Sequence, residues 1–126
     1  MEHSPEELNV SRAIAELAYA IAKADGVLDD QERQAFLQIL TQEFELSETT
    51  ARLRFEAIFQ SANNSVEVAY QQAIFLLQRN KKALNAEVVS RCKTVLLKVA
   101  EVSGVSQEEK RILERFNKDI QQIYEG

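Results

Sequence analysis

The chain has 126 residues, the length of a single domain, with 45% apolar and 28% charged residues, which is typical of a globular protein. One cysteine and one histidine exclude an internal disulfide framework, a Cys-x-x-Cys zinc site and histidine-based metal sites. The net charge is −5, and residues 1–45 hold three Lys or Arg against ten Asp or Glu, so we do not expect nucleic-acid binding.

No segment has the pattern of a membrane span or of a signal peptide. Apolar runs are short: residues 73–77 form one of only five residues, far fewer than the roughly 20 that a spanning helix needs. The first residues lack a basic start followed by an apolar core. We therefore expect a protein of the reducing cytoplasm.

The spacing of apolar residues is helical along almost the whole chain and predicts six helices joined by short linkers. A residue that can cap a helix start precedes each apolar stripe. In chain order, the expected helix starts are Ser4-Pro5, Asp29 with Glu32, Ser47, Ser65, Asn85, and Ser106 with Glu109. The predicted fold class is all-α: a compact helical bundle of about six helices, in a single domain of residues 1–126.

Each predicted helix has one apolar face that we expect to be buried. Taken helix by helix, these positions are Val10, Ile14, Leu17, Ala18 and Ile21; Phe36, Leu37, Leu40 and Phe44; Ala51, Phe55, Ile58 and Ala62; Val66, Tyr70, Ala73, Ile74 and Leu77; Val88, Val89, Cys92, Val95, Leu96 and Val99; and Ile112, Leu113, Phe116, Ile120 and Ile123. No segment alternates apolar and polar residues for long enough to compete as a β-strand.

Two helix junctions, near residues 18–36 and 97–116, resemble each other. Both run from a helix through a small polar residue and Gly-Val to a capping residue, with a glutamate three positions later, and Gly26 and Gly104 stand at the turns. Glycine suits the left-handed conformation that often follows a helix end. The sequence therefore predicts an internal pseudo-repeat of two helix-loop-helix units.

The first junction is rich in carboxylates. Three of the chain's four aspartates, including Asp25 and Asp29, lie within the eight residues that end at Glu32. Carboxylates that converge on a turn are ligands for hard cations such as calcium and magnesium, but the same residue types also form turns and helix caps. Both interpretations stay open. An EF-hand is excluded, because its first and third ligand positions would be Ile21 and Lys23.

The segment 19–33, which contains Ala24-Asp25-Gly26 and Glu32, resembles the signature of the TerB-like domains, the family of tellurite resistance protein B. The second junction, which ends in Glu108-Glu109-Lys110, resembles the second copy of that signature. The resemblance covers most of the chain, since length, helical pattern and both junctions agree.

The resemblance implies an all-helical, bacterial, cytoplasmic domain whose acidic junctions bind a divalent cation. It also implies a non-enzymatic role in stress responses and in membrane-associated or chaperone assemblies. Position by position, Asp25 and Glu32 match the family's acidic pair, whereas Ser103 replaces the second aspartate and leaves Glu109. With Asp29 from the same turn, the predicted metal ligands are Asp25, Asp29, Glu32 and Glu109, and calcium or magnesium is the expected ion.

Three further features have a structural and a functional interpretation. Cys92 is expected to pack as a small buried hydrophobe. Phe75 does not lie on the apolar face of its predicted helix, which indicates either a second buried face or an exposed groove for a partner. Tyr124 has the helical spacing of a core residue and is expected to be buried. A basic cluster predicts either a solvated face or a docking surface for an acidic partner, which includes a second copy and hence a homo-oligomer. It consists of Arg79, Lys81, Lys82, Arg91, Lys93 and Lys98. Lys81 and Lys82 are expected to end the fourth helix, where cations complement the helix dipole.

Three functions follow as hypotheses. The first is a binding or adaptor module for protein partners, tuned by a divalent cation at the acidic junction. The second is a metal-independent helical interaction domain in which the acidic residues serve only as caps. The third is metal-assisted hydrolysis by paired carboxylates. It is disfavoured because the chain lacks a glycine-rich phosphate loop and a set of histidine or cysteine ligands for a metal.

Overall fold

The computed structural model describes residues 5–23, 29–44, 47, 49–50, 52–53, 56, 65–102, 104 and 106–126. In these residues the chain is helical, as predicted, and no strand is present. The helices are α1 (Pro5–Lys23), α2 (Asp30–Glu43), α4 (Val66–Arg79), the 3-10 helix η1 (Lys81–Ala83), α5 (Ala86–Val102) and α6 (Gln107–Glu125). The fold class is thus confirmed, while most of the helix predicted after Ser47 lies outside the described residues.

Helix starts are fixed by the predicted capping residues. Asp29 and Ser106 each accept a hydrogen bond from the backbone N–H three residues on, and a glutamate at that position completes a capping box. Ser65 and Asn85 accept from the backbone N–H of the third residue that follows, in α4 and α5. Ser47 makes the same bond with the backbone N–H of Thr50, so the predicted cap is present there as well.

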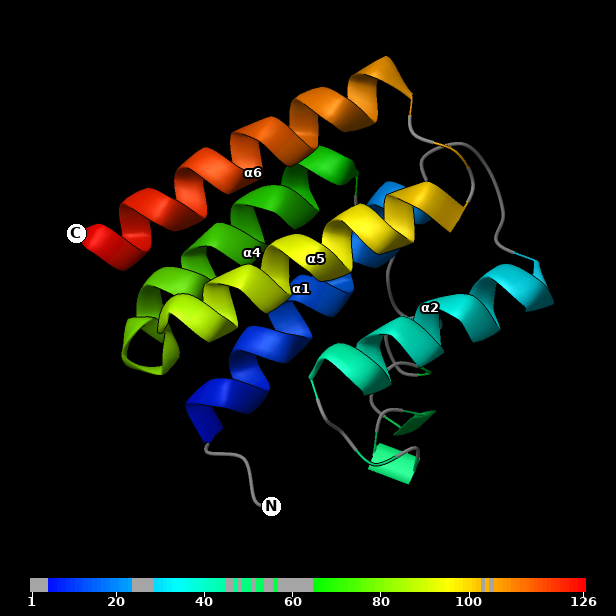
Figure 1. Cartoon of the computed structure of the whole chain (residues 1–126), viewed down its shortest axis with the longest axis horizontal. Coiled ribbons are helices and arrows are strands. Elements are labelled where there is room, and N and C mark those ends of the chain that lie inside the picture. Colours follow the sequence, from blue (N-terminus) through cyan, green and yellow to red (C-terminus); the bar gives the residue numbers. More distant parts are fainter. Residues whose placement is uncertain are drawn as a thin grey trace.

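Helix α1 is the centre of the bundle and packs against α4 and α5. Helix α5 also packs against α2 and α6, and α6 packs against α4. Alanines among the buried positions of α1 let these neighbours approach closely; the buried residues are Val10, Ser11, Ala13, Ile14, Ala15, Leu17, Ala18, Tyr19, Ala20 and Ile21. Figure 1 shows that α1 and α5 run in one direction and α2, α4 and α6 in the other. The end of α1 and the starts of α4 and α6 therefore lie at the same end of the bundle.

Two details differ from the predictions. Lys81 and Lys82 do not end the fourth helix but lie in η1, because the buried Asn80 ends α4. Its side-chain amide donates to the carbonyl of Leu76 over 2.7 Å and accepts from Asn9 over 3.2 Å. The core prediction for Tyr124 is wrong: its side chain is 36% exposed, since it lies in the last turn of α6, beyond the buried Ile120.

Candidate functional site

The first junction places two of the predicted metal ligands together, at the start of α2. Oδ1 of Asp29 accepts from the backbone N–H of Glu32 over 2.8 Å, and Oε1 of Glu32 accepts from the backbone N–H of Asp29 over 3.2 Å. Asp29 is exposed and Glu32 is partly exposed. The capping box needs only one oxygen of each carboxylate, so Oδ2 and Oε2 are not required for it. Asp25 lies outside the described residues.

The second junction repeats the capping box at the start of α6, but in a buried setting. The backbone N–H of Glu109 donates to the Ser106 hydroxyl over 3.1 Å, and the backbone N–H of Ser106 donates to Oε1 of Glu109 over 3.3 Å. Gly104, at the turn, has a φ of 87°, as the sequence predicts for a glycine that follows a helix end. Glu109 is only 3% exposed, and its Oε2 has no hydrogen-bond partner in the part of the chain that the structure describes.

A cavity of about 440 Å³ opens beside Glu109. Its walls come from the end of α1 and the first turns of α4 and α6, which meet at one end of the bundle (Figure 1). The walls combine apolar side chains with carboxylates and guanidiniums. The lining residues are Ile21, Val66, Glu67, Tyr70, Ser106, Glu108, Glu109, Arg111, Ile112 and Arg115. This volume lies within the range of small-molecule sites, about 300 to 1,000 Å³.

One wall of the cavity is held by a network of charged and aromatic groups from α4 and α6. The guanidinium of Arg115 donates to both oxygens of Glu67, over 2.9 and 3.2 Å, and lies 4.0 Å from the ring centroid of Tyr70. The Tyr70 hydroxyl donates to Asp119 over 2.6 Å. These contacts couple the two helices and fix the orientation of the side chains that they join.

The network shifts the pKa values of its members. The hydrogen bonds from Arg115 lower the pKa of Glu67 below its usual value, and the same bonds raise the pKa of Arg115. Burial, and after it the hydrogen bond to the Asp119 carboxylate, raises the pKa of Tyr70 well above that of a free tyrosine. Tyr70 is therefore a neutral hydrogen-bond donor at physiological pH.

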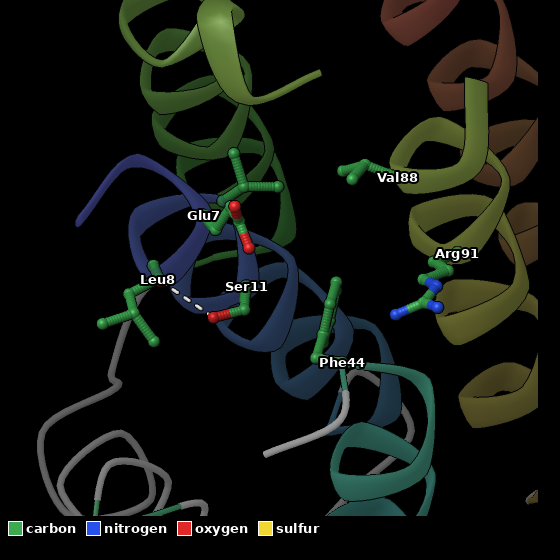
Figure 2. A pocket seen from close by; sticks show the side chains of 7 residues that line it. Glu7, Leu8, Ser11, Phe44, Val88 and Arg91 are labelled. Carbon is green, nitrogen blue, oxygen red and sulfur yellow. Dashed lines mark hydrogen bonds between the residues drawn. The ribbon is translucent and has the colours of Figure 1, made fainter. Parts of the chain in front are cut away.

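A second hollow lies between the first half of α1, the end of α2 and the start of α5 (Figure 2). Its volume is about 40 Å³, room for a few water molecules and not for a ligand. Figure 2 shows Phe44 and Arg91 on facing sides of it and the hydrogen bond, 2.8 Å long, from the Ser11 hydroxyl to the carbonyl of Leu8. Arg91 donates to the carbonyl of Glu43 over 3.1 Å and so ties α5 to the end of α2.

The structure separates the predicted metal ligands. Asp29 and Glu32 lie at the start of α2, whereas Glu109 lies at the start of α6, on the other side of α5 (Figure 1). Within the described ranges, no three Asp, Glu, His or Cys side chains are grouped as a metal site would require. A cation site at the first junction that includes Asp25 stays a prediction.

The basic cluster is partly neutralised. Lys98 forms an ion pair with Glu43 over 2.7 Å, Arg91 forms one with Glu87, and Lys93 donates to Gln121 over 3.2 Å. Arg79 lies over the exposed ring of Phe75, 5.5 Å from its centroid, so Phe75 does not form a second buried face. Cys92 is fully buried, as predicted, and burial raises the pKa of its thiol to about 12.

The comparison with protein families agrees with the two junctions. A family model described as "Tellurite resistance protein TerB" matches residues 11–121. The chain belongs to the TerB family. No match was found among curated proteins, and none among solved structures. No helix that the structure describes is both long enough and apolar enough to cross a membrane.

Within this TerB-family domain, the sequence pointed to Glu109 but not to the cavity beside it. Glu67, Tyr70 and Arg115 were not singled out as a group, because they lie on two helices about 45 positions apart in the chain and share no motif. The available signal was weak: Arg115 and Asp119 are spaced as an i,i+4 pair on one helix face. Only the packing of α4 against α6 brings that pair to Tyr70.

Proposed function

We propose that this TerB-family chain is a non-enzymatic binding module of the bacterial cytoplasm that serves protein partners in stress-response, membrane-associated or chaperone assemblies. Its proposed ion is calcium or magnesium, held at the first junction by Asp25, Asp29 and Glu32. The observation that carries the ion proposal is the capping box at the start of α2. It fixes two carboxylates on one exposed turn and needs only one oxygen of each.

The proposed ion site does not include Glu109, because that residue lies at the other junction, across α5. Hard divalent cations take six or more oxygen ligands, so backbone carbonyls and water would complete the shell at the first junction. The proposal of a non-enzymatic role is supported by the fact that polar side chains in the cavity wall are already bonded to other groups of the protein. Ser106 serves as a cap, and Glu67 and Arg115 pair with each other.

A thermal melt tests this function. The protein is melted in chelator and then with calcium, magnesium, manganese or zinc at about 1 mM. A ligand that binds only the folded state at a hundredfold excess over Kd stabilises by about 2.7 kcal/mol, which raises Tm by several degrees for a domain of this size. We expect the rise with calcium or magnesium, and we expect Asp25→Asn with Glu32→Gln to abolish it. Glu109→Gln is the matched control and should retain it.

The second candidate is a metal-independent helical interaction domain. It is favoured by the fact that both Asp29 and Glu32 already have a capping role, which alone explains their identity and spacing. In this case Tm is the same with every ion and in chelator. The double variant then loses only the small contribution of the cap, whether or not an ion is present.

A further inference from the structure

We propose that the outward side of α4 and the 3-10 helix η1 together dock an acidic amphipathic helix of a partner protein. This surface, the α4 face, consists of Val68, Phe75, Arg79, Lys81 and Lys82. The inference deepens the proposed role as a binding module for protein partners and rests on that part of it. It does not depend on the ion proposed at the first junction.

Two exposed apolar side chains lie on one stripe of α4. Val68 is 44% exposed and Phe75 is 55% exposed, and they are seven positions apart in the helix. This spacing is close to two helical turns, so both side chains project from the same side, about 10 Å apart along the axis. Helix α4 packs its buried side against α1 and α6. Apolar anchors at this spacing are what a second helix contacts when it lies alongside the first.

Arg79 holds the ring of Phe75 at the surface. Its guanidinium lies 5.5 Å from the ring centroid, within the range of a cation–π contact. The ring adds little to the core, because more than half of it is exposed. Aromatic and arginine side chains are enriched at protein interfaces, and a side chain that is already held loses less freedom on binding. This pair is therefore suited to be the anchor of an interface.

Three cations at the end of α4 and in η1 lack a neutralising carboxylate. Arg79, Lys81 and Lys82 are exposed, and none of them forms an ion pair with any residue that the structure describes. The carboxylate that follows them in the chain, Glu87, is bound by Arg91 at the start of α5, which lies beside the end of α4 (Figure 1). The end of a helix carries about half a negative charge, which three full positive charges exceed. An acidic partner supplies the missing charge.

The positions of the anchors and the cations define the partner helix. Its apolar side chains contact Val68 and Phe75, and its acidic residues lie at the end of α4. Because acidic residues stabilise the first turn of a helix, we expect the two helices to be antiparallel. The acidic helix of this chain itself, α2, does not fit this description. Its exposed side chains in the first turns are all polar: Asp30, Gln31, Arg33 and Gln34.

An NMR titration of the whole chain tests the proposal. The probe is a synthetic alanine-rich helix of about 20 residues, with two leucines seven positions apart and three glutamates in its first turns. The control peptide has glutamine in place of each glutamate. The reporters are the methyl groups of Val68 and the backbone amides of α4 and η1. We expect saturable shifts with a Kd on the order of 0.1 mM, and binding of the control peptide about tenfold weaker. Equal binding of the two peptides, or no saturable shift with the acidic one, overturns the proposal.

A first pair of matched variants tests the apolar anchor. Phe75→Ala removes the exposed ring of the α4 face, whereas Leu97→Ala shortens a side chain of α5 that is 46% exposed. We expect Phe75→Ala to weaken binding of the acidic peptide by about tenfold and Leu97→Ala to leave it unchanged. Both side chains are exposed, and the amide spectrum without peptide checks that each variant is folded. Equal affinities of the two variants contradict the assignment.

A second pair tests the cations at constant net charge. Arg79→Gln with Lys82→Gln removes two charges from the α4 face, and Lys110→Gln with Lys118→Gln removes two exposed charges from α6. A general attraction of an acidic peptide to basic residues predicts equal losses. Docking on the α4 face predicts a loss of about tenfold in the first double variant alone. Equal losses therefore overturn the proposal.

Other occupants are separate outcomes of the same experiments. A dimer that sediments without peptide and that Phe75→Ala dissociates would overturn the proposal in favour of a second copy. Shifts of the α4 face with phosphatidylserine vesicles, and none with the peptide, would overturn it in favour of a membrane surface. Saturable binding of the acidic peptide to another face overturns the α4 face but leaves the chain a binding module. The melt with metal ions reports on the first junction alone.

Discussion

The starts of α2 and α6 use the same local device in two different environments. Both have a capping residue that accepts from the third backbone N–H, and a glutamate that accepts in return. At α2 the Asp29 side chain is exposed and that of Glu32 is partly exposed. At α6 the glutamate is 3% exposed, and one of its oxygens lacks a partner in the described residues.

The difference comes from packing and not from the junction sequence. The first turn of α6 lies beside the end of α1 and the start of α4, whose Ile21 and Val66 line the same cavity as Glu109. Helix α2 packs chiefly against α5, and its N-cap Asp29 and first residues Asp30 and Gln31 are exposed. A local motif thus fixes the cap, while its neighbours decide whether the carboxylate is an ordinary surface group or a buried acceptor.

The largest expected effect is a difference between matched variants of the two capping glutamates. We expect their free energies of unfolding to change in opposite directions. Glu109→Met keeps most of the volume, removes a buried unpartnered charge and loses one capping bond. Replacement of a buried ion pair by apolar side chains of similar size is often neutral or stabilising by 1–4 kcal/mol, and Oε2 of Glu109 has no partner among the described residues, so we expect a net gain of about 2 kcal/mol. Glu32→Met only loses its cap and should destabilise by about 0.5 kcal/mol. Urea unfolding at neutral pH measures both.

The outcome that breaks this comparison is equally clear. If Glu109→Met destabilises the protein more than Glu32→Met does, Oε2 of Glu109 is already satisfied in solution, and the two boxes are equivalent. A gain in stability is instead what is expected when a polar group is kept at a cost to the fold.

The next largest effect concerns the two junction glycines. Gly104 has a φ of 87°, and a Cβ added to it would meet no atom within 4 Å. Gly104→Ala therefore adds only backbone strain, about 1.5 kcal/mol for a left-handed alanine. If the two junctions share one turn, as the sequence predicts, Gly26→Ala has a similar effect, which paired urea melts would show. A loss at Gly104 alone would mean that the first junction uses a different turn.

Much of this fold is predictable from the sequence because helix starts and buried stripes are local signals. The capping boxes at Asp29 and Ser106, the caps at Ser65 and Asn85, and the burial of Leu17, Cys92 and Phe116 all agree with the spacing of residues along the chain. Helix α4 ends at Arg79, before the predicted end at Lys81 and Lys82. This end is set by Asn80, whose partner Asn9 lies on another helix and is invisible to local reasoning.

The candidate site was predictable only in part, for the same reason. The pairing of Glu109 with Ser106 follows from their spacing. The burial of Glu109 and the network of Tyr70, Arg115 and Glu67 depend on how α4 and α6 pack, and no periodicity within one helix reports that. Function in this domain is therefore easier to locate from the packing of helices than from the acidic motif that first draws attention.

The smallest effect tests the wall of the α6 site by pH. Tyr70→Phe removes the hydrogen bond to Asp119 and should lower the free energy of unfolding by about 1 kcal/mol at neutral pH. Because the folded protein raises the pKa of Tyr70, the stability from this hydroxyl is fully present below the unfolded pKa of about 10 and is lost as pH rises above it. The difference between wild type and Tyr70→Phe should therefore shrink to zero within about one pH unit above 10. Urea melts at several pH values measure it, and tyrosinate absorbance of the folded chain checks that Tyr70 ionises late. A difference that stays constant through that range would mean that Tyr70 ionises as it does in the unfolded chain, so the wall beside Glu109 would be as open to water as the start of α2.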